Sequence, residues 1–150
     1  MSRNGGRPRI LVLNQYYWPG VEATAHLLTE LCEEHGGLLC LDEVKTGFGR
    51  SGHMFAGERW GLAPDLVCLG KAMGGGVMPI GAVLGSERAM GSFDDVPTGS
   101  TWSWLPAACA AALATLDLYA REPVLEHVAE LERLASGRLA ELRERFEAIG

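Results

Sequence analysis

Three short apolar runs limit what this chain of 150 residues can fold into. Residues 9–14, 38–41 and 66–69 are rich in Leu, Ile and Val, and each run has the length of a β-strand. An apolar run without polar alternation is typical of a strand that is buried on both faces of a parallel sheet. Residues 22–34 carry apolar side chains at helical spacing between the first two runs, so the pattern predicts an α/β fold.

In the rest of the chain the pattern likewise predicts strands that alternate with helices. Ser86 has the side chain of a helix N-cap, and Glu87 would complement the helix dipole in the first turn. Pro106 suits the first turn of a helix. The expected elements are a short helix at 54–60, a strand at 79–84, a polar loop at 93–103, an Ala-rich helix at 106–119 and an amphipathic helix at 124–146.

Charge and hydropathy argue against two classes of function. The chain has 13 Lys and Arg against 19 Asp and Glu, which gives a formal net charge of −6 at pH 7. A nucleic-acid partner needs clustered Lys and Arg to neutralise its phosphates, so none is expected. No apolar run approaches the roughly 20 residues that span a bilayer, and the short run after the basic N-terminus does not make a signal peptide. We therefore expect a cytoplasmic protein without a membrane partner.

The cysteines predict buried packing rather than a metal centre, and the glycines predict tight turns. The four cysteines, at 32, 40, 68 and 109, form no CxxC pair, so we expect small buried hydrophobes instead of a disulfide framework or a zinc site. The 20 glycines are concentrated between residues 47 and 99, where tight turns and close backbone approach are expected.

Chemically active side chains follow two of the apolar runs. Asp42 and Glu43 come directly after one run, and Lys71 comes after another, just before three consecutive glycines. In α/β sheets, ligands bind at the carboxyl ends of the strands, where an acid and an amine would meet. A nucleotide phosphate loop is not indicated, because Asp65 stands where its first glycine belongs and Ala72 replaces its metal-binding hydroxyl residue.

Several ordered blocks of this segment resemble the class III aminotransferases, of the ornithine and 4-aminobutyrate type. The blocks are LDEVKTGFGRSG at 41–52, PDLVCLGKAMGGG at 64–76, PIGA at 79–82, SFDD at 92–95, GST at 99–101 and ACAAAL at 108–113. The resemblance covers about residues 31–150. It implies a pyridoxal 5'-phosphate enzyme of fold type I, and here a partial large domain with a mostly parallel sheet and flanking helices.

The resemblance also implies roles for individual residues. Lys71 matches the lysine that forms a Schiff base with the cofactor aldehyde and then moves a proton at the reacting carbon. Asp42 matches the acid that pairs with the pyridine nitrogen, and Val44 matches the apolar residue on the ring face. Ser100 and Thr101 match the loop that binds the cofactor phosphate, which in this family is supplied across the interface of a homodimer.

Two positions depart from the family pattern. Lys45 stands where a glutamine usually reaches the phenolic oxygen of the cofactor; a cation can also donate there, so Lys45 is kept as a cofactor contact. Trp104, followed by Leu105 and Pro106, stands where Gly-Asn-Pro usually follows the phosphate loop.

The function implied is transfer of an amino group from an amine or ω-amino acid to a 2-oxo acid. A complete class III enzyme is more than twice this length, so the chain is expected to be a truncated large domain. Two alternatives stay open: an aminomutase of the same fold, of the glutamate-semialdehyde type, and a non-catalytic module that only associates with another chain.

The N-terminal segment has a different resemblance. Residues 9–30 look like the first strand, loop and helix of a GT-B glycosyltransferase rather than the opening of an aminotransferase. The sequence therefore predicts two parts: an appended β-loop-α unit at 1–30 and the aminotransferase fragment at 31–150. Chance similarity of one such unit is the alternative.

Overall fold

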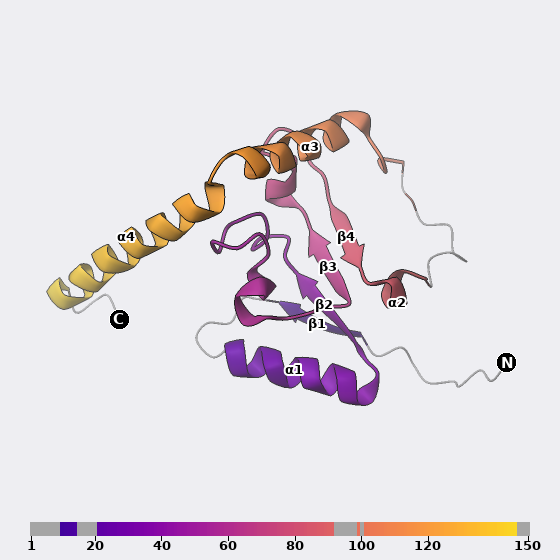
Figure 1. Cartoon of the computed structure of the whole chain (residues 1–150), viewed down its shortest axis with the longest axis horizontal. Helices are drawn as coiled ribbons and strands as arrows, with labels where there is room; N and C mark the ends of the chain where they lie inside the picture. The colour runs from indigo at the N-terminus through magenta and orange to yellow at the C-terminus, as the bar shows by residue number, and fades with distance from the viewer. Residues whose placement is uncertain (1–9, 15–20, 92–98, 100, 147–150) are drawn as a thin grey trace.

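The chain forms one small α/β sheet with helices around it (Figure 1). The computed structural model describes residues 10–14, 21–91, 99 and 101–146, and side chains from residue 27. The strands are β1 Ile10–Asn14, β2 Leu38–Asp42, β3 Leu66–Leu69 and β4 Ala82–Gly85. The helices are α1 Val21–His35, α2 Glu87–Met90, α3 Pro106–Arg121 and α4 Val124–Arg145, with two 3-10 helices, η1 Ala56–Trp60 and η2 Lys71–Gly74.

The sheet is mostly parallel, as the sequence predicts. Its strand order is β1-β2-β3-β4, in which β1 pairs with β2 and β2 with β3 in parallel, and β4 pairs with β3 in antiparallel. The three apolar runs are therefore the three parallel strands. Because these strands run in one direction, the residues that follow β2 and β3 emerge at the same edge of the sheet.

Two expected elements differ in detail. The fourth strand begins at Ala82 rather than at residue 79, since Pro79 has no N–H to donate to a ladder. The short helix expected at 54–60 is η1, a 3-10 helix that ends at Gly61 in the left-handed region (φ 62°). Most of the polar loop expected at 93–103 lies outside the described residues.

The interior is built on β2. Leu39 and Leu41 are each 2% exposed and contact the buried Cys32 of α1. These two leucines are separated by one residue, so they lie on the same face of the strand. Helix α1 thus covers one face of the sheet, as Figure 1 shows.

A second packing contact links α3 to the loop after β2. Tyr119 of α3 donates a hydrogen bond to the carbonyl of Phe48 at 2.6 Å, and the two rings meet edge to face with their centroids 6.3 Å apart. Phe48 also meets the ring of Phe55 edge to face. These contacts place α3 across the glycine-rich loop, far along the sequence from it.

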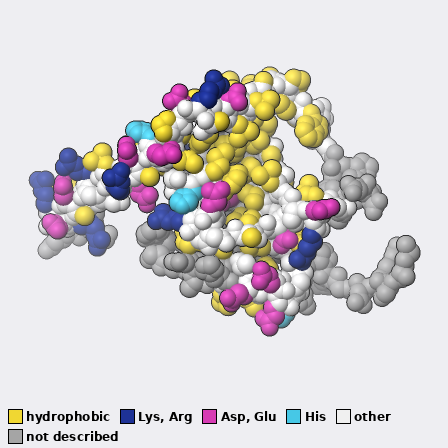
Figure 2. Space-filling model, in the orientation of Figure 1, with side chains coloured by type: hydrophobic (Ala, Val, Ile, Leu, Met, Phe, Trp, Pro, Cys, Tyr) yellow, Lys and Arg dark blue, Asp and Glu magenta, His cyan; other side chains and the backbone are white. Residues whose placement is uncertain are grey.

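Helix α4 extends away from the sheet and buries none of its residues (Figure 1). The apolar side chains of this helix are present as expected, but the described residues do not bury them. Those at least 36% exposed are Leu131, Leu134, Leu139, Leu142 and Phe146. In Figure 2 the hydrophobic side chains gather on α3 and the centre of the molecule, whereas charged side chains line α4. Among the described helices, none is long and apolar enough to cross a membrane.

Candidate active site

Asp42 is the last residue of β2, at the edge where the parallel strands end. Its Oδ1 accepts a hydrogen bond from the backbone N–H of Val44 at 3.0 Å. This local bond orients the carboxyl group and is typical of an acidic residue at a turn. In the part of the chain that the structure describes, Oδ2 makes no hydrogen bond, so one oxygen is available to a ligand.

Lys71 begins η2, and only Gly70 separates it from the end of β3. Its backbone is in the left-handed region (φ 43°), which is costly for a residue with a Cβ. Its side chain is exposed. Backbone strain of this kind is concentrated at functional sites, so the conformation of Lys71 makes it a candidate functional residue independently of its sequence motif.

The strand register brings these two residues to one edge. Asp42 lies opposite Cys68 in the β2–β3 pair, and Lys71 follows Cys68 by three residues. Three residues at the extended rise of about 3.3 Å give a separation of at most about 10 Å along the strand direction. The backbone therefore brings Asp42 and Lys71 to the same edge of the sheet.

Val44 lies close to the segment that leads to Lys71. A Cβ built on Gly70 would come within 3.3 Å of Cγ1 of Val44, which means that the glycine lets the two segments approach. Lys45 is exposed, and its carbonyl accepts a hydrogen bond from Nε of Arg50 at 2.9 Å. Val44 thus borders the Asp42–Lys71 edge, and Lys45 faces solvent beside it.

The residues predicted to bind the phosphate come before α3, not at the ends of β2 and β3. Thr101 is exposed in the turn that precedes α3, and Ser100 lies outside the described residues. In the same turn Trp104 has φ 61° and is 89% exposed. A tryptophan therefore stands in a backbone conformation that glycine adopts freely, at the position where the family pattern has glycine.

Glu43 is a residue whose importance the sequence did not reveal. It is 1% exposed, and its carboxyl group accepts hydrogen bonds from the backbone N–H of Gly57 (2.8 Å), the backbone N–H of Ala56 (3.1 Å) and the hydroxyl of Thr46 (2.5 Å). The signal in the sequence is spacing: Glu43 follows the buried Leu39 and Leu41 of β2 at intervals of two residues. What Glu43 contacts could not be read from the sequence.

The thiols behind this edge are free. The four cysteines form no disulfide, and Sγ of Cys40 lies 3.9 Å from Sγ of Cys68 on the neighbouring strand. Burial, with further contributions from Cys68 and Asp42, raises the pKa of Cys40 from 9.0 to about 11. A thiol held neutral in this way packs as a small apolar group. Among the described residues there is no cluster of His, Cys, Asp or Glu that could hold a metal ion.

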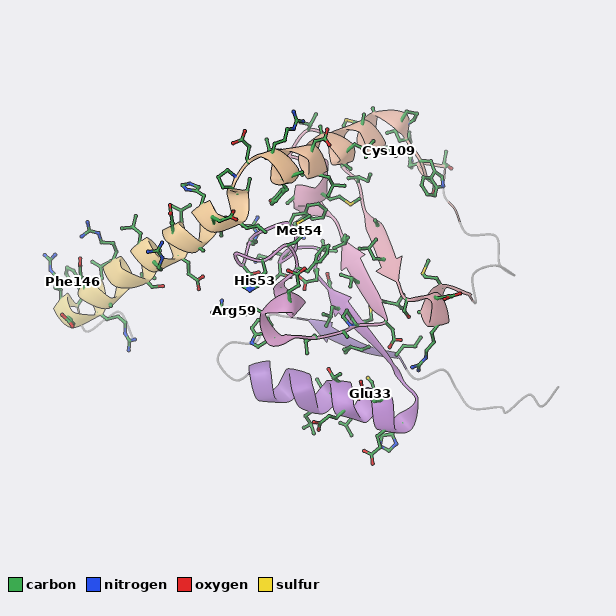
Figure 3. The ribbon with its side chains drawn as sticks, in the orientation of Figure 1. Glu33, His53, Met54, Arg59, Cys109 and Phe146 are labelled. Atoms are coloured by element: carbon green, nitrogen blue, oxygen red, sulfur yellow. The ribbon has the colours of Figure 1, made fainter. Side chains whose placement is uncertain are left out.

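The loop between β2 and β3 joins the site to the rest of the molecule. Figure 3 shows His53, Met54 and Arg59 in this part of the chain, on the side from which α4 projects. Arg59 forms an exposed ion pair with Glu132 of α4 at 3.4 Å. Such a pair contributes little stability, so the loop depends mainly on its buried contacts.

Known proteins are similar to this chain in sequence and in fold. The family model "Aminotransferase class-III" matches residues 19–150. The putrescine aminotransferase of Pectobacterium atrosepticum is 46% identical over 114 residues, which are 75% of this chain and 23% of that protein. The acetylornithine aminotransferase of Methanothermobacter thermautotrophicus is 43% identical over 120 residues, which are 80% of this chain and 30% of that protein.

Structural comparison gives the same answer. The taurine:2-oxoglutarate aminotransferase of Bifidobacterium kashiwanohense, solved in complex with PLP and glutamate, superposes with a TM-score of 0.77 at 35% identity. The match covers 81% of this chain and 28% of that one. The chain thus spans between about a quarter and a third of the length of these relatives. With a family match over most of its length and the same partial α/β sheet, this chain belongs to the class III aminotransferases.

Proposed function

We propose that this chain is the part of a pyridoxal-phosphate-dependent aminotransferase that holds the cofactor ring, in an enzyme that moves an amino group from an amine or ω-amino acid to a 2-oxo acid. One observation carries the proposal: Asp42 and Lys71 leave neighbouring parallel strands at the same edge of the sheet. The relatives named above act, by their names, on putrescine, acetylornithine and taurine. Diamines and ω-amino acids are therefore the donors to test first.

The residues at this edge suit the cofactor. Oδ2 of Asp42 is available to the ring nitrogen, while the bond from Val44 to Oδ1 keeps the carboxyl group in place. Lys71 is exposed, and its backbone lies at most about 10 Å from that of Asp42 along the strand direction, a span that a pyridine ring and two side chains can bridge. The side chain of Val44 borders the same space and offers an apolar contact to one ring face.

Each residue then has a defined task. Pyridoxal phosphate, when bound, supplies an aldehyde that joins an amine covalently and a ring that withdraws electrons from the reacting carbon. The Nζ of Lys71 would hold the cofactor through that aldehyde and, when free, would move a proton at the reacting carbon. The carboxylate of Asp42 keeps a proton on the ring nitrogen, which is what makes the ring an electron acceptor.

Further contacts complete the proposed site. Lys45 donates to the phenolic oxygen of the cofactor from the position where the family usually has glutamine. Ser100 and Thr101 bind the phosphate of the cofactor held by a second copy of the chain, in a homodimer. The family match and the exposed position of Thr101 before α3 support this arrangement.

A labelling experiment tests the cofactor site directly. The sequence contains two lysines, Lys45 and Lys71, so a trapped cofactor has few alternatives. The purified chain is mixed with pyridoxal phosphate, reduced with borohydride, digested with trypsin and mapped by mass spectrometry. We expect the label on Lys71 in the wild type and in Lys45→Arg, and no lysine label in Lys71→Arg. A label on Lys45 or on the N-terminal amine in place of Lys71 contradicts the assignment.

The reaction type is decided by the need for an acceptor. Transfer of an amino group requires an added 2-oxo acid, whereas an aminomutase returns the amino group to the same carbon skeleton without one. Product analysis of the intact protein with and without a 2-oxo acid separates the two. Product formed without acceptor favours the aminomutase.

Association without catalysis is the second candidate function, because much apolar surface is uncovered. Leu113 and Leu118 of α3 and Leu134 of α4 are all more than 50% exposed. Measurement of the mass in solution by light scattering, with and without pyridoxal phosphate, separates the candidates. A stable oligomer that takes up no cofactor favours an association module.

The N-terminal part is proposed separately. We infer that residues 1–30 form a β-loop-α unit of GT-B glycosyltransferase origin, joined to an aminotransferase fragment at 31–150. The resemblance of residues 9–30 supports this, whereas the family match begins at residue 19 and so competes with it over 19–30. The flanking DNA decides: a glycosyltransferase reading frame upstream agrees with the fusion, and an aminotransferase frame upstream overturns it.

A further inference from the structure

Glu43 is the one charged side chain that is fully buried among the described residues. Burial of a carboxylate costs free energy unless hydrogen bonds compensate it. Here three donors face its two oxygens: the N–H groups of Ala56 and Gly57, and the hydroxyl of Thr46. A leucine at this position would leave the N–H groups of Ala56 and Gly57 without the carboxylate that accepts from them, so the acid stabilises the fold through its contacts.

The contacts of Glu43 tie together three segments around the end of β2. Its backbone N–H donates to the carbonyl of Cys68 on β3 at 2.9 Å, and its own carbonyl accepts from the N–H of Gly47 at 2.8 Å. Its side chain reaches 13 and 14 residues along the sequence, to the first residues of η1. The end of β2 is therefore held by β3, by the following turn and by η1 at the same time.

The fit around the carboxyl group leaves little freedom. A Cβ on Gly57 would come within 2.7 Å of Cδ1 of Leu41 and 3.5 Å of Oε1 of Glu43. Glycine at 57 thus allows the backbone of η1 to reach the carboxylate. The side chain of Glu43 cannot shift far, because Leu41 and η1 enclose it.

Asp42, the last residue of β2, and Val44, in the turn that follows, flank Glu43. The bond from the N–H of Val44 to Oδ1 of Asp42 spans the residue that Glu43 occupies. We propose that Glu43 is a positioning residue, which anchors the back of this turn so that Asp42 presents its free oxygen to the ring nitrogen of the cofactor. The role toward the cofactor rests on the function proposed above, whereas the effect on the Asp42–Val44 bond does not.

The substitution Glu43→Gln separates anchoring from simple burial. Glutamine has the same shape but one acceptor oxygen and an NH₂ group, so one of the two η1 amides loses its acceptor. Amide hydrogen exchange at Val44 reports the Asp42–Val44 bond without any cofactor. For this comparison, urea is added to the wild type until its free energy of unfolding equals that of the variant. Under these conditions we expect amide exchange at Val44 to be about 10-fold faster in Glu43→Gln than in the wild type. Thr46→Val, which removes one donor, gives a smaller rise and serves if the first variant does not fold.

The exposed Glu58 of η1 provides the matched control, because Glu58→Gln makes the same chemical change outside the network. Unchanged exchange at Val44 in both Glu43→Gln and Thr46→Val overturns the inference, since the bond would then be independent of Glu43. A rise of the same size in Glu58→Gln overturns it as well.

A cofactor arm tests the action through Asp42. The dissociation constant of pyridoxal phosphate, measured from its visible absorption, is expected to rise about 10-fold in Glu43→Gln. The same change is expected to have no further effect when Asp42→Asn is already present, because the two residues act as one unit. Equal effects in both backgrounds contradict positioning. If the wild type takes up no cofactor on Lys71, the proposed function fails, and the exchange measurement alone still decides the role of Glu43 in holding Asp42.

Discussion

The hydrogen bond from Tyr119 to Phe48 gives the sharpest stability prediction, because one atom can be removed and the ring kept. The bond is 2.6 Å long and joins residues 71 apart in the sequence. Phe48 is 6% exposed, so its carbonyl has little access to water after the hydroxyl is removed. Tyr119→Phe keeps the edge-to-face contact between the rings and deletes only the donor.

The expected loss is that of one partner of a largely buried hydrogen bond. Such a deletion costs about 1–2 kcal/mol of the free energy of unfolding. With a urea m-value of about 2 kcal/mol/M, a loss of about 1.5 kcal/mol lowers the urea midpoint by about 0.75 M. Circular dichroism during a urea titration measures this shift. Tyr119→Leu, which also removes the ring contacts, should shift the midpoint further.

The pH dependence supplies an independent check. Burial raises the pKa of Tyr119 above its ordinary value of 10.0, against a smaller opposite effect of Arg50. The stability that the tyrosine contributes is therefore complete below pH 10 and is lost as pH rises through the raised value. A midpoint for Tyr119→Phe within about 0.1 M of wild type at neutral pH would refute the reasoning, since the carbonyl of Phe48 would then not depend on the hydroxyl.

Two further predictions concern the interior and the turns. The pKa of Cys40 is raised to about 11, so its neutral thiol contributes stability that is complete below pH 9 and is lost between pH 9 and pH 11. The urea midpoint of the wild type should therefore fall over this range, and the fall should be smaller in Cys40→Ala. Gly47→Ala would place a Cβ 2.8 Å from the backbone carbonyl oxygen of Glu43, so we expect a loss of about 1–3 kcal/mol in urea titrations. Gly91→Ala is its control, because Gly91 has φ −60° and no atom within 4 Å of the added Cβ, and it should be neutral or stabilising by up to about 1 kcal/mol. Equal losses in the two glycine variants would contradict the steric argument.

The sequence alone determined the elements and the edge at which the chemistry is expected. The apolar runs at 38–41 and 66–69 are β2 and β3, and the residues that follow them, Asp42 and Lys71, emerge together. These features follow from local patterns: unbroken apolar runs select buried parallel strands, and parallel strands end at one edge. The N-cap of α2 is equally local, and the side chain of Ser86 accepts from the N–H of Ala89 as expected.

Only the tertiary structure decided how that edge is held. The acid at 43 reads as one half of an Asp-Glu pair in the sequence, yet its partners lie in η1, 13 and 14 residues away. The bond from Tyr119 to Phe48 and the left-handed backbone of Lys71 are likewise invisible in the sequence. The physical reason is that periodicity records which face of an element is apolar, whereas the partner of a buried polar group depends on where a distant segment returns to the sheet.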